Sequence, residues 1–344
     1  MTGRRAVSMA EVARVAGVSQ STVSHVINRT RRIKADTELS VRQAIERTGY
    51  TNDGIARSLR TGQTHMIGLA ISAISNPYFG EVVHAMERES VRAGYALLLV
   101  DTHDDPQREA EALSQLLMRR VDGVILATSA SSATALEHLG RRRVPTLLFD
   151  RVPADVEHLG MDAIAVENVE PVAQLVDHLA VLGHRRIGMI AGQPGLTTTE
   201  ERVQGYRAGV RRNRVVDNAS LVQYGGSRDR VATAVGELLR GPHGCTSLVT
   251  GNNATTIATM AALAELGVDV PRDLALVAFD DFPWADYFRP RLTAMSQPLD
   301  ELGRRSVELL LERIAEPDRP PRTERLVPTL MHRESCGVHA HGSP

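Results

Sequence analysis

Short apolar runs alternate with longer amphipathic stretches over most of the chain, from residue 66 onward. The runs have the length of buried strands, and the stretches repeat apolar residues at helical spacing. The predicted strands are Met66–Ile71, Ala96–Asp101, Gly123–Ala127, Thr146–Asp150, Arg186–Ala191, Ser247–Thr250, Leu274–Asp280 and Thr293–Ser296. The predicted helices are Phe79–Ala93, Pro106–Arg119, Val169–Leu182, Thr199–Arg212, Arg228–Leu239, Asn252–Leu266 and Leu299–Ile314. This alternation is typical of parallel sheets with helices on both faces, and its length predicts two doubly wound α/β lobes.

The start of the chain shows a different pattern, that of two short helices joined by a tight turn. Ser8 and Glu11 have the spacing of a helix-capping box, and Gly17 stands where a chain leaving a helix needs a left-handed residue. Ser19 can cap the second helix. The outward positions of this helix carry small or hydrogen-bonding side chains: Gln20, Ser21, Ser24, His25 and Asn28. Such a helix can enter the major groove of DNA and read base edges; a small surface pair of helices is the alternative.

A third helix is expected from Asp36 to Thr48, so that residues 1–49 form a small all-α domain. Residues 50–63 follow as a linker, in which Gly54 weakens any helix. Its length is below what an isolated helix needs in water. We therefore expect a linker that becomes helical only in a complex, with a permanently unstructured tether as the alternative.

The charge of the chain is unevenly distributed. Residues 1–62 hold eleven basic and five acidic side chains, a net charge of +6, and because the whole chain carries −1 the remainder carries −7. A basic head on an acidic body is the expected arrangement when only the head meets phosphates.

Composition and motifs narrow the functional class further. At 344 residues the chain predicts two or three domains. It shows no apolar run of membrane-spanning length and no signal-peptide pattern, so a cytoplasmic protein is expected. Cys245 and Cys336 are too few for a metal cage. The acidic run from Asp101 to Asp105 fits a loop that opens a helix at Pro106 better than a metal site. Dinucleotide, P-loop and nucleophile-elbow motifs are absent, so we expect no catalytic residues, metal or cofactor.

A series of short motifs runs through both parts of the chain. They are Glu11-Val12-Ala13, Ala16-Gly17-Val18-Ser19, Thr22-Val23-Ser24, Ile55 to Gly62, Ser75-Asn76-Pro77-Tyr78-Phe79, Asp122-Gly123-Val124-Ile125, Asp150-Arg151, Leu182 to Ile187, Arg202 with Gly205-Tyr206, Phe279-Asp280-Asp281, and Leu292-Thr293 with Gln297-Pro298. Each motif is weak alone, but in this order and spacing they are specific together. Over nearly its whole length the chain resembles the LacI/GalR family of transcriptional regulators.

The resemblance implies a homodimer that holds a pseudo-palindromic DNA operator with two recognition helices. Gln20, Ser21 and His25 match positions that read bases, although most relatives carry arginine where this chain has His25, so a different half-site is expected. Leu59 matches a leucine that wedges into the minor groove at the operator centre. The expected DNA-binding residues are Ser19, Gln20, Ser21, Thr22, Ser24, His25, Asn28, Arg29, Asn52, Ala56, Leu59 and Arg60.

The core, residues 64–340, resembles the periplasmic sugar-binding fold, in which the chain crosses between two lobes three times. We place the crossings near Asp162, Leu292 and Arg325, which gives lobes of about 64–162 with 293–325 and about 163–292 with 326–340. The expected effector-binding residues are Tyr78, Phe79, Asp150, Arg202, Asn252, Asp280, Trp284 and Gln297. Acidic, amide and guanidinium groups together suit a sugar or similar polyol.

Alternatives accompany these expectations. Arg202 could be a solvated helix residue, and Asp150 and Asp280 could be capped turns. A nucleoside or phosphorylated co-repressor is an alternative ligand, but the sequence Gly225-Gly226-Ser227 stands where some relatives place a stacking aromatic ring. A sugar-transport or carbohydrate-processing protein is the alternative from another class. The chain after Glu334 lacks leucine heptads, which favours a dimer over a coiled-coil tetramer.

Overall fold

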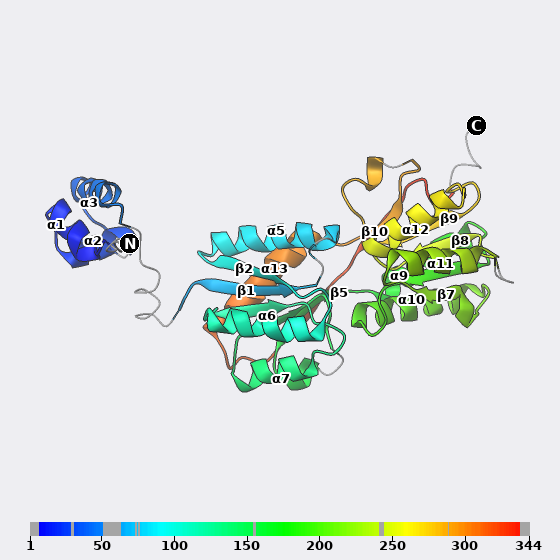
Figure 1. Ribbon diagram of the computed structural model, residues 1–344, viewed down its shortest axis with the longest axis horizontal. Helices are drawn as coiled ribbons and strands as arrows, with labels where there is room; N and C mark the ends of the chain where they lie inside the picture. The colour runs from blue at the N-terminus through cyan, green and yellow to red at the C-terminus, as the bar shows by residue number, and fades with distance from the viewer. Residues whose placement is uncertain are drawn as a thin grey trace, which may run out of the picture. The chain divides into compact units, whose positions relative to one another are not determined.

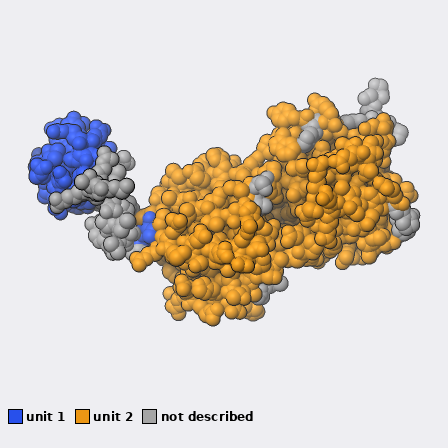
Figure 2. Space-filling view, in the orientation of Figure 1, with its two compact units in different colours: residues 1–64 blue, residues 65–344 orange. Residues whose placement is uncertain are grey.

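The structure is a computed structural model that describes residues 7–28, 31–50, 63–72, 74, 76–153, 156–240, 244–287 and 289–337. It divides into two compact units, Met1–Thr64 and His65–Pro344 (Figure 2). None of the described helices combines the length and the apolar character that spanning a bilayer requires.

The N-terminal unit contains the helices α1 (Met9–Ala16), α2 (Gln20–Asn28) and α3 (Ala35–Thr48). The side chain of Ser8 accepts a hydrogen bond from the amide of Glu11 at 3.4 Å, and Gly17 ends α1 with a φ of 69°. Fully buried valines from all three helices meet in its small core, together with the nearly buried Ala44. The local signals for a helix pair and a third helix are therefore confirmed.

The first lobe of the larger unit is a six-stranded parallel sheet in the order β11-β5-β4-β3-β1-β2. Its strands are β1 (Met66–Ile71), β2 (Ala96–Asp101), β3 (Gly123–Leu126), β4 (Thr146–Phe149), β5 (Asp162–Val166) and β11 (Thr323–Leu326). Its helices are α5 (Pro77–Arg92), α6 (Pro106–Met118), α7 (Ala133–Arg141), α8 (Val156–Leu159) and α13 (Leu299–Ala315). Helices α5 and α13 cover one face of the sheet, and α6 and α7 lie on the other (Figure 1). A Cβ atom at Gly303 would lie 2.5 Å from that of Ala85, so glycine lets α13 approach α5 closely.

The second lobe repeats this plan in the order β12-β10-β9-β8-β6-β7. Its strands are β6 (Ile187–Ala191), β7 (Val222–Tyr224), β8 (Ser247–Thr250), β9 (Ala275–Phe279), β10 (Thr293–Ser296) and the antiparallel β12 (Thr329–Met331). Its helices are α9 (Val169–Val181), α10 (Thr197–Asn213), α11 (Arg228–Arg240) and α12 (Asn253–Glu265), with short 3₁₀ turns at Ala219–Leu221 and Ala285–Tyr287. Helices α9 and α10 pack together on one face, and α11 and α12 on the other. The prediction of two doubly wound lobes is confirmed.

The chain crosses between the lobes after β5, after β10 and after β11. Because β5 pairs with β4 and β11, residues 162–166 belong wholly to the first sheet, and because β10 pairs with β9, residues 293–296 belong to the second. The crossings therefore fall a few residues beyond Asp162, Leu292 and Arg325. Strands β5, β7, β11 and β12 and helices α7 and α8 were not predicted. Strands β11 and β12 are short and pair with strands that lie far away in the sequence, β5 and β10.

A buried carboxylate joins three segments of the first lobe. Asp162, fully buried at the start of β5, accepts hydrogen bonds from Arg313 of α13 at 2.9 and 3.0 Å and from Arg319 at 2.7 Å. It also accepts from the backbone amide of Arg322 at 2.8 Å, just before β11. Both guanidinium groups are largely buried, so neither can be solvated if the carboxylate is lost.

We predict that Asp162→Asn lowers the free energy of unfolding by about 3–5 kcal/mol, because removing one partner leaves buried charges without compensation. Urea denaturation of the full chain measures this. The matched control is Asp300→Asn, whose carboxylate pairs with Arg88 at 3.0 Å on the surface and should contribute about 1 kcal/mol or less. Equal losses in the two variants would contradict the anchoring role of Asp162.

Candidate functional site

Helix α2 presents two different faces. Val23 is fully buried and Val26 nearly so, whereas Gln20 and Ser21 are exposed and His25 is half-buried. This matches the division between core positions and outward positions that the sequence predicts.

Ser19 fixes the start of α2 by capping it. Its hydroxyl accepts from the amide of Thr22 at 3.2 Å and lies 2.8 Å from both the Ser21 and Thr22 hydroxyls. The first turn is thus held by side-chain hydrogen bonds, as expected for a capped helix. Arg29, Asn52, Ala56, Leu59, Arg60 and the side chain of Asn28 lie outside the described residues, as does most of the 50–63 linker.

In the larger unit, corresponding strands of the two lobes end in aspartates with an unusual backbone. Asp150 follows β4 with a φ of 65°, and Asp280 follows β9 with a φ of 76°. Aspartate tolerates this left-handed conformation better than most residues, but it still carries strain. Both side chains are buried, so each carboxylate must find partners inside the protein.

On the first lobe the partner of Asp150 is Tyr78, from the first turn of α5. The Tyr78 hydroxyl donates to Asp150 Oδ1 at 3.0 Å. The neighbouring Arg151 lies with its Nε 3.8 Å from Asp150 Oδ2, donates to the Thr128 carbonyl at 2.9 Å and pairs with Asp104. These contacts settle Asp150 as part of a buried network rather than an isolated capped turn.

On the second lobe the network is built around Arg202 of α10, which is only 6% exposed. Its Nε donates to Asn168 Oδ1 at 2.8 Å, and its Nη1 donates to the Gly251 carbonyl at 2.6 Å. Its guanidinium lies 3.9 Å from the centre of the Phe279 ring. Arg202 is therefore not a solvated helix residue.

The remaining contacts of this network reach Asp280. Nη2 of Arg202 lies 4.0 Å from Asp280 Oδ1, and the side-chain amide of Gln297 donates to the same oxygen. Arg202 and Gln297 thus approach one carboxylate oxygen from separate elements, which leaves Asp280 paired inside the lobe.

Charged groups of the second lobe affect the pKa values of groups in the first lobe. Burial raises the pKa of Asp150, the charges of Arg151 and Arg202 and the Tyr78 hydrogen bond oppose that rise, and the charge of Asp280 adds to it. Burial likewise raises the pKa of the Tyr78 hydroxyl, and the charges of both aspartates raise it further. The charge of Asp280 in the second lobe therefore acts on Asp150 and Tyr78 in the first lobe.

A cavity of about 490 Å³ opens beside this network, with walls from both lobes. Phe79, Asp104 and Arg151 line it from the first lobe, and Gly226, Ser227 and Asn252 are among the residues of the second. Tyr78, Asp150, Arg202, Asp280 and Gln297 are buried and are not among the residues that line it. The lining residues Arg151 and Phe79 connect the first-lobe part of the network to the cavity, since Arg151 lies 3.8 Å from Asp150 and the Phe79 ring packs against that of Tyr78. Asn252 also caps α12 by accepting from the Thr255 amide at 2.9 Å.

Trp284 takes no part in this cavity. It lies in the loop after β9 with its ring centre 4.1 Å from that of Phe282, and its side chain is half-exposed. Trp284 is therefore not among the residues that line the described cavity.

Sequence reasoning missed three members of the site: Arg151, Asp104 and Asn168. Arg151 stood in a quoted motif, but its burial depends on the Thr128 carbonyl and on Asp104. Asp104 belongs to the acidic run from Asp101 to Asp105. In the same run, Asp105 caps α6 by accepting a hydrogen bond from the Arg108 amide at 2.8 Å. Asp104 itself lines the cavity and pairs with Arg151.

Comparison of the sequence with known proteins identifies the family of the chain. Residues 8–53 match the family described as bacterial regulatory proteins, lacI family, and residues 176–336 match the periplasmic binding protein-like domain. The chain is 35% identical over 335 residues to the ribose operon repressor of Escherichia coli (strain K12), covering 96% of this chain and 99% of that protein. The chain belongs to the LacI family.

Solved structures agree with this membership. The complex of the transcriptional regulator CelR with cellobiose has a TM-score of 0.72 and 28% identity, and it covers 96% of this chain and 99% of its own. The lac repressor dimer bound to operator and the anti-inducer ONPF has the same coverage with a TM-score of 0.83; at 24% identity it shows the shared fold. The expected family and fold class are confirmed, and this LacI-family chain is a transcriptional regulator rather than an enzyme.

The raised pKa of Asp150 gives a pH-dependent prediction for this LacI-family regulator. Between the ordinary pKa of an aspartate and the raised pKa, the folded state binds more protons than the unfolded state, so stability falls as pH rises through that window. Asparagine does not titrate there. Urea denaturation from acidic to neutral pH should therefore show wild type losing stability relative to Asp150→Asn. Parallel curves for the two proteins would show that the buried carboxylate is not penalised.

Proposed function

We propose that the chain is a repressor whose affinity for operator DNA is controlled by a sugar or sugar derivative bound between the two core lobes. The observation that carries this is a cavity lined by both lobes, together with two buried carboxylates, Asp150 in one lobe and Asp280 in the other, close enough for the charge of Asp280 to raise the pKa of Asp150. Carboxylates and a rigid guanidinium are suited to hold vicinal hydroxyl groups. The ribose named in one relative and the cellobiose named in another support the same ligand class.

The proposed domains are a DNA-binding domain at 1–49, a hinge at 50–63 and the effector and dimerisation core at 64–340. The proposed effector-binding residues are Tyr78, Phe79, Asp150, Arg202, Asn252, Asp280 and Gln297. A flat base is a weaker candidate for the cavity, since Gly226 and Ser227, which stand where some relatives place a stacking ring, offer none, and Phe79 is the aromatic residue among those that line the described cavity.

The proposed DNA interface is formed by two copies of α2. Gln20, Ser21 and His25 read bases, and Ser19, Thr22 and Asn28 contact phosphates. Leu59 of the hinge enters the minor groove. The exposure of Gln20 and Ser21 supports this assignment, as does the operator-bound dimer among the similar structures. Such a regulator acts where the chromosome lies, in the cytoplasm and bound to the nucleoid.

Ligand control follows from the position of the cavity. A sugar that bonds groups of both lobes favours one angle between them, and the dimer passes this angle to the hinges. Coupling of this kind is typically about 1–3 kcal/mol and is reciprocal, so operator DNA changes sugar affinity by the same factor.

The experiment is a thermal-shift screen of the full chain against pentoses, hexoses, disaccharides, nucleosides and sugar phosphates, because a ligand that binds only the native state raises its melting temperature. A sugar that shifts the melting temperature is then added to the protein bound to a selected operator. Release of DNA identifies an inducer and tighter binding a co-repressor. Chemical turnover of the sugar, or shifts by nucleosides alone, would overturn the proposal.

Arg202→Ala should weaken sugar binding by about 2 kcal/mol or more, roughly 30-fold, because truncation leaves buried polar partners unsatisfied. Operator binding without sugar should persist, since Arg202 lies in the core. Calorimetry measures the first and fluorescence anisotropy the second. Arg207→Ala, an exposed arginine of the same helix, is the matched control. An unchanged sugar response would remove Arg202 from the site.

Leu59→Ala should cost the operator complex on the order of a few kcal/mol, because the apolar wedge that bends the duplex is lost. Binding to random DNA, which depends on phosphate contacts, should be nearly unchanged. Anisotropy titrations on both DNAs measure the difference. Leu39→Ala, an exposed leucine of α3, controls for loss of surface apolar area. Equal weakening on operator and random DNA would contradict the wedge.

A further inference from the structure

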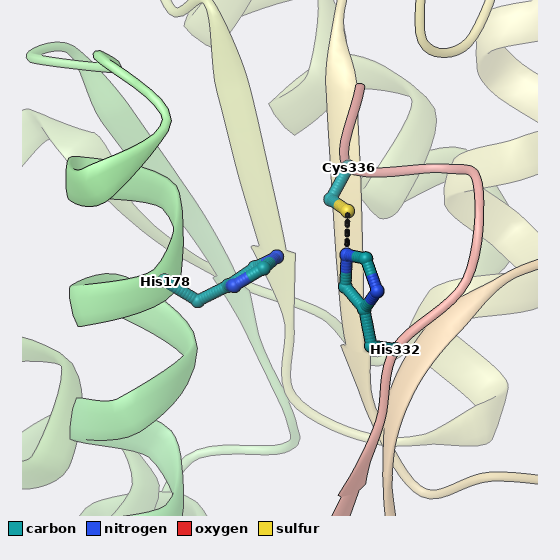
Figure 3. A group of neighbouring side chains, drawn as sticks. All are labelled: His178, His332 and Cys336. Atoms are coloured by element: carbon teal, nitrogen blue, oxygen red, sulfur yellow. Dashed lines mark hydrogen bonds between the residues drawn. The ribbon is translucent and has the colours of Figure 1, made fainter. Parts of the chain in front are cut away.

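Three side chains from two distant parts of the chain meet in the second lobe (Figure 3). His178 lies in the last turn of α9, His332 directly follows β12, and Cys336 lies in the turn after it. Their ligand-forming nitrogen and sulfur atoms all lie within 4.8 Å of one another. The His178 ring points toward the other two side chains. None of the three lines the described cavity between the lobes.

Not every polar atom of the cluster has a hydrogen-bond partner among the described residues. Cys336 Sγ lies 3.4 Å from His332 Nε2, and the two imidazole rings meet edge to face with centres 5.1 Å apart. The Nε2 atom of His178 is buried and has no hydrogen-bond partner among the described residues. A buried polar atom without a partner costs free energy, and an unseen ion is one of the explanations for it.

The nitrogen and sulfur atoms of the cluster favour a particular class of metal ion. Two imidazole nitrogens and one thiolate are the ligands that Zn²⁺ and similar borderline-soft divalent metals prefer. With metal–sulfur and metal–nitrogen bonds of about 2.3 and 2.0–2.1 Å, two nitrogen donors in a tetrahedral site lie about 3.3–3.4 Å apart, and a sulfur and a nitrogen donor about 3.5–3.6 Å apart. The Cys336–His332 distance of 3.4 Å is already close to the second value, and His332 is exposed and can move toward His178.

The surroundings of Cys336 also suit a metal-bound sulfur. The thiol is fully buried, and the hydroxyl of Thr293 donates to Sγ at 3.4 Å. A hydrogen bond to the sulfur stabilises a thiolate ligand from outside the coordination sphere. The thiol proton, which lies within reach of the Arg333 carbonyl at 3.5 Å, is released to solvent when the metal–sulfur bond forms.

We propose that His178, His332 and Cys336 bind one zinc-class divalent metal ion, with water at the fourth position beside the exposed His332. The ion joins α9 to the segment after β12, close behind the point where the chain makes its last crossing from the first lobe. Cysteine counting alone gave no metal site, because the ligands are two histidines and one cysteine brought together by the fold. The alternative is an ordinary Cys–His hydrogen bond without metal affinity.

The test is titration of the full chain, purified without a histidine tag, with Co²⁺ as the probe. One equivalent should give a sulfur-to-cobalt charge-transfer band and the intense visible bands of tetrahedral cobalt, and Zn²⁺ should displace both. His332→Ala should weaken Co²⁺ binding at least about tenfold, and because the side chain is exposed this variant should keep its fold by circular dichroism. Cys336→Ser should abolish the charge-transfer band.

Two matched variants serve as controls. Cys245→Ser removes the other buried thiol, and His138→Ala removes an exposed imidazole of α7. Both should leave the cobalt spectrum unchanged. Absence of the charge-transfer band in wild type, its survival in Cys336→Ser, or equal weakening by His138→Ala and His332→Ala would each overturn the proposal in favour of no site or of general surface binding.

Discussion

The arrangement of the core residues follows from one constraint: two carboxylates, buried at the ends of strands in opposite lobes, must have their charges compensated inside the protein. Asp150 and Asp280 are too deeply buried to be solvated, and each raises the pKa of Tyr78 between them. Arg202 and Gln297 provide partners for Asp280, while Tyr78 and Arg151 provide them for Asp150. The charges of the two lobes are therefore coupled, because Arg202 lowers and Asp280 raises the pKa of Asp150 across the boundary between the lobes.

The topology of the two sheets explains why Asp150 and Asp280 occupy equivalent positions in the two lobes. In a doubly wound parallel sheet the loops at the carboxyl ends of the strands meet at one edge, and β4 and β9 occupy equivalent places in the two sheets. Among the described elements, the chain crosses between the lobes after β5, β10 and β11. Two rigid bodies joined by a few extended segments suit a change of angle better than a change of shape. The His178, His332 and Cys336 cluster joins α9, which follows the first of these crossings, to the segment after the last, and none of its residues lines the described cavity.

Much of this could be predicted from sequence where the cause is local. The cap at Ser19, the left-handed Gly17 and the strand that ends at Asp150 depend on near neighbours, and all were expected. The burial of Arg202 could not be predicted, because it depends on Asn168 and on the Gly251 carbonyl, which come from other elements. The lobe boundaries shifted for the same reason, since the membership of β5 and β10 is decided by pairing with distant strands. The metal-type cluster likewise joins residues from α9 and from the end of the chain.

The buried network also bears on how a regulator with this cavity would select its ligand under the proposed function. Asp280 is already bonded by Gln297 and Asp150 by Tyr78, so a sugar hydroxyl must replace or supplement existing hydrogen bonds rather than fill empty ones. The net gain for each hydroxyl is therefore modest, about 0.5–1.5 kcal/mol. An analogue that opens the network but lacks a hydroxyl leaves a buried carboxylate without its partner, and that loss is larger than the gain. Discrimination among similar sugars thus comes from the free energy lost when a hydrogen bond of Asp150 or Asp280 is broken and not replaced. This loss depends on the burial of the two carboxylates more than on the number of contacts that the sugar makes.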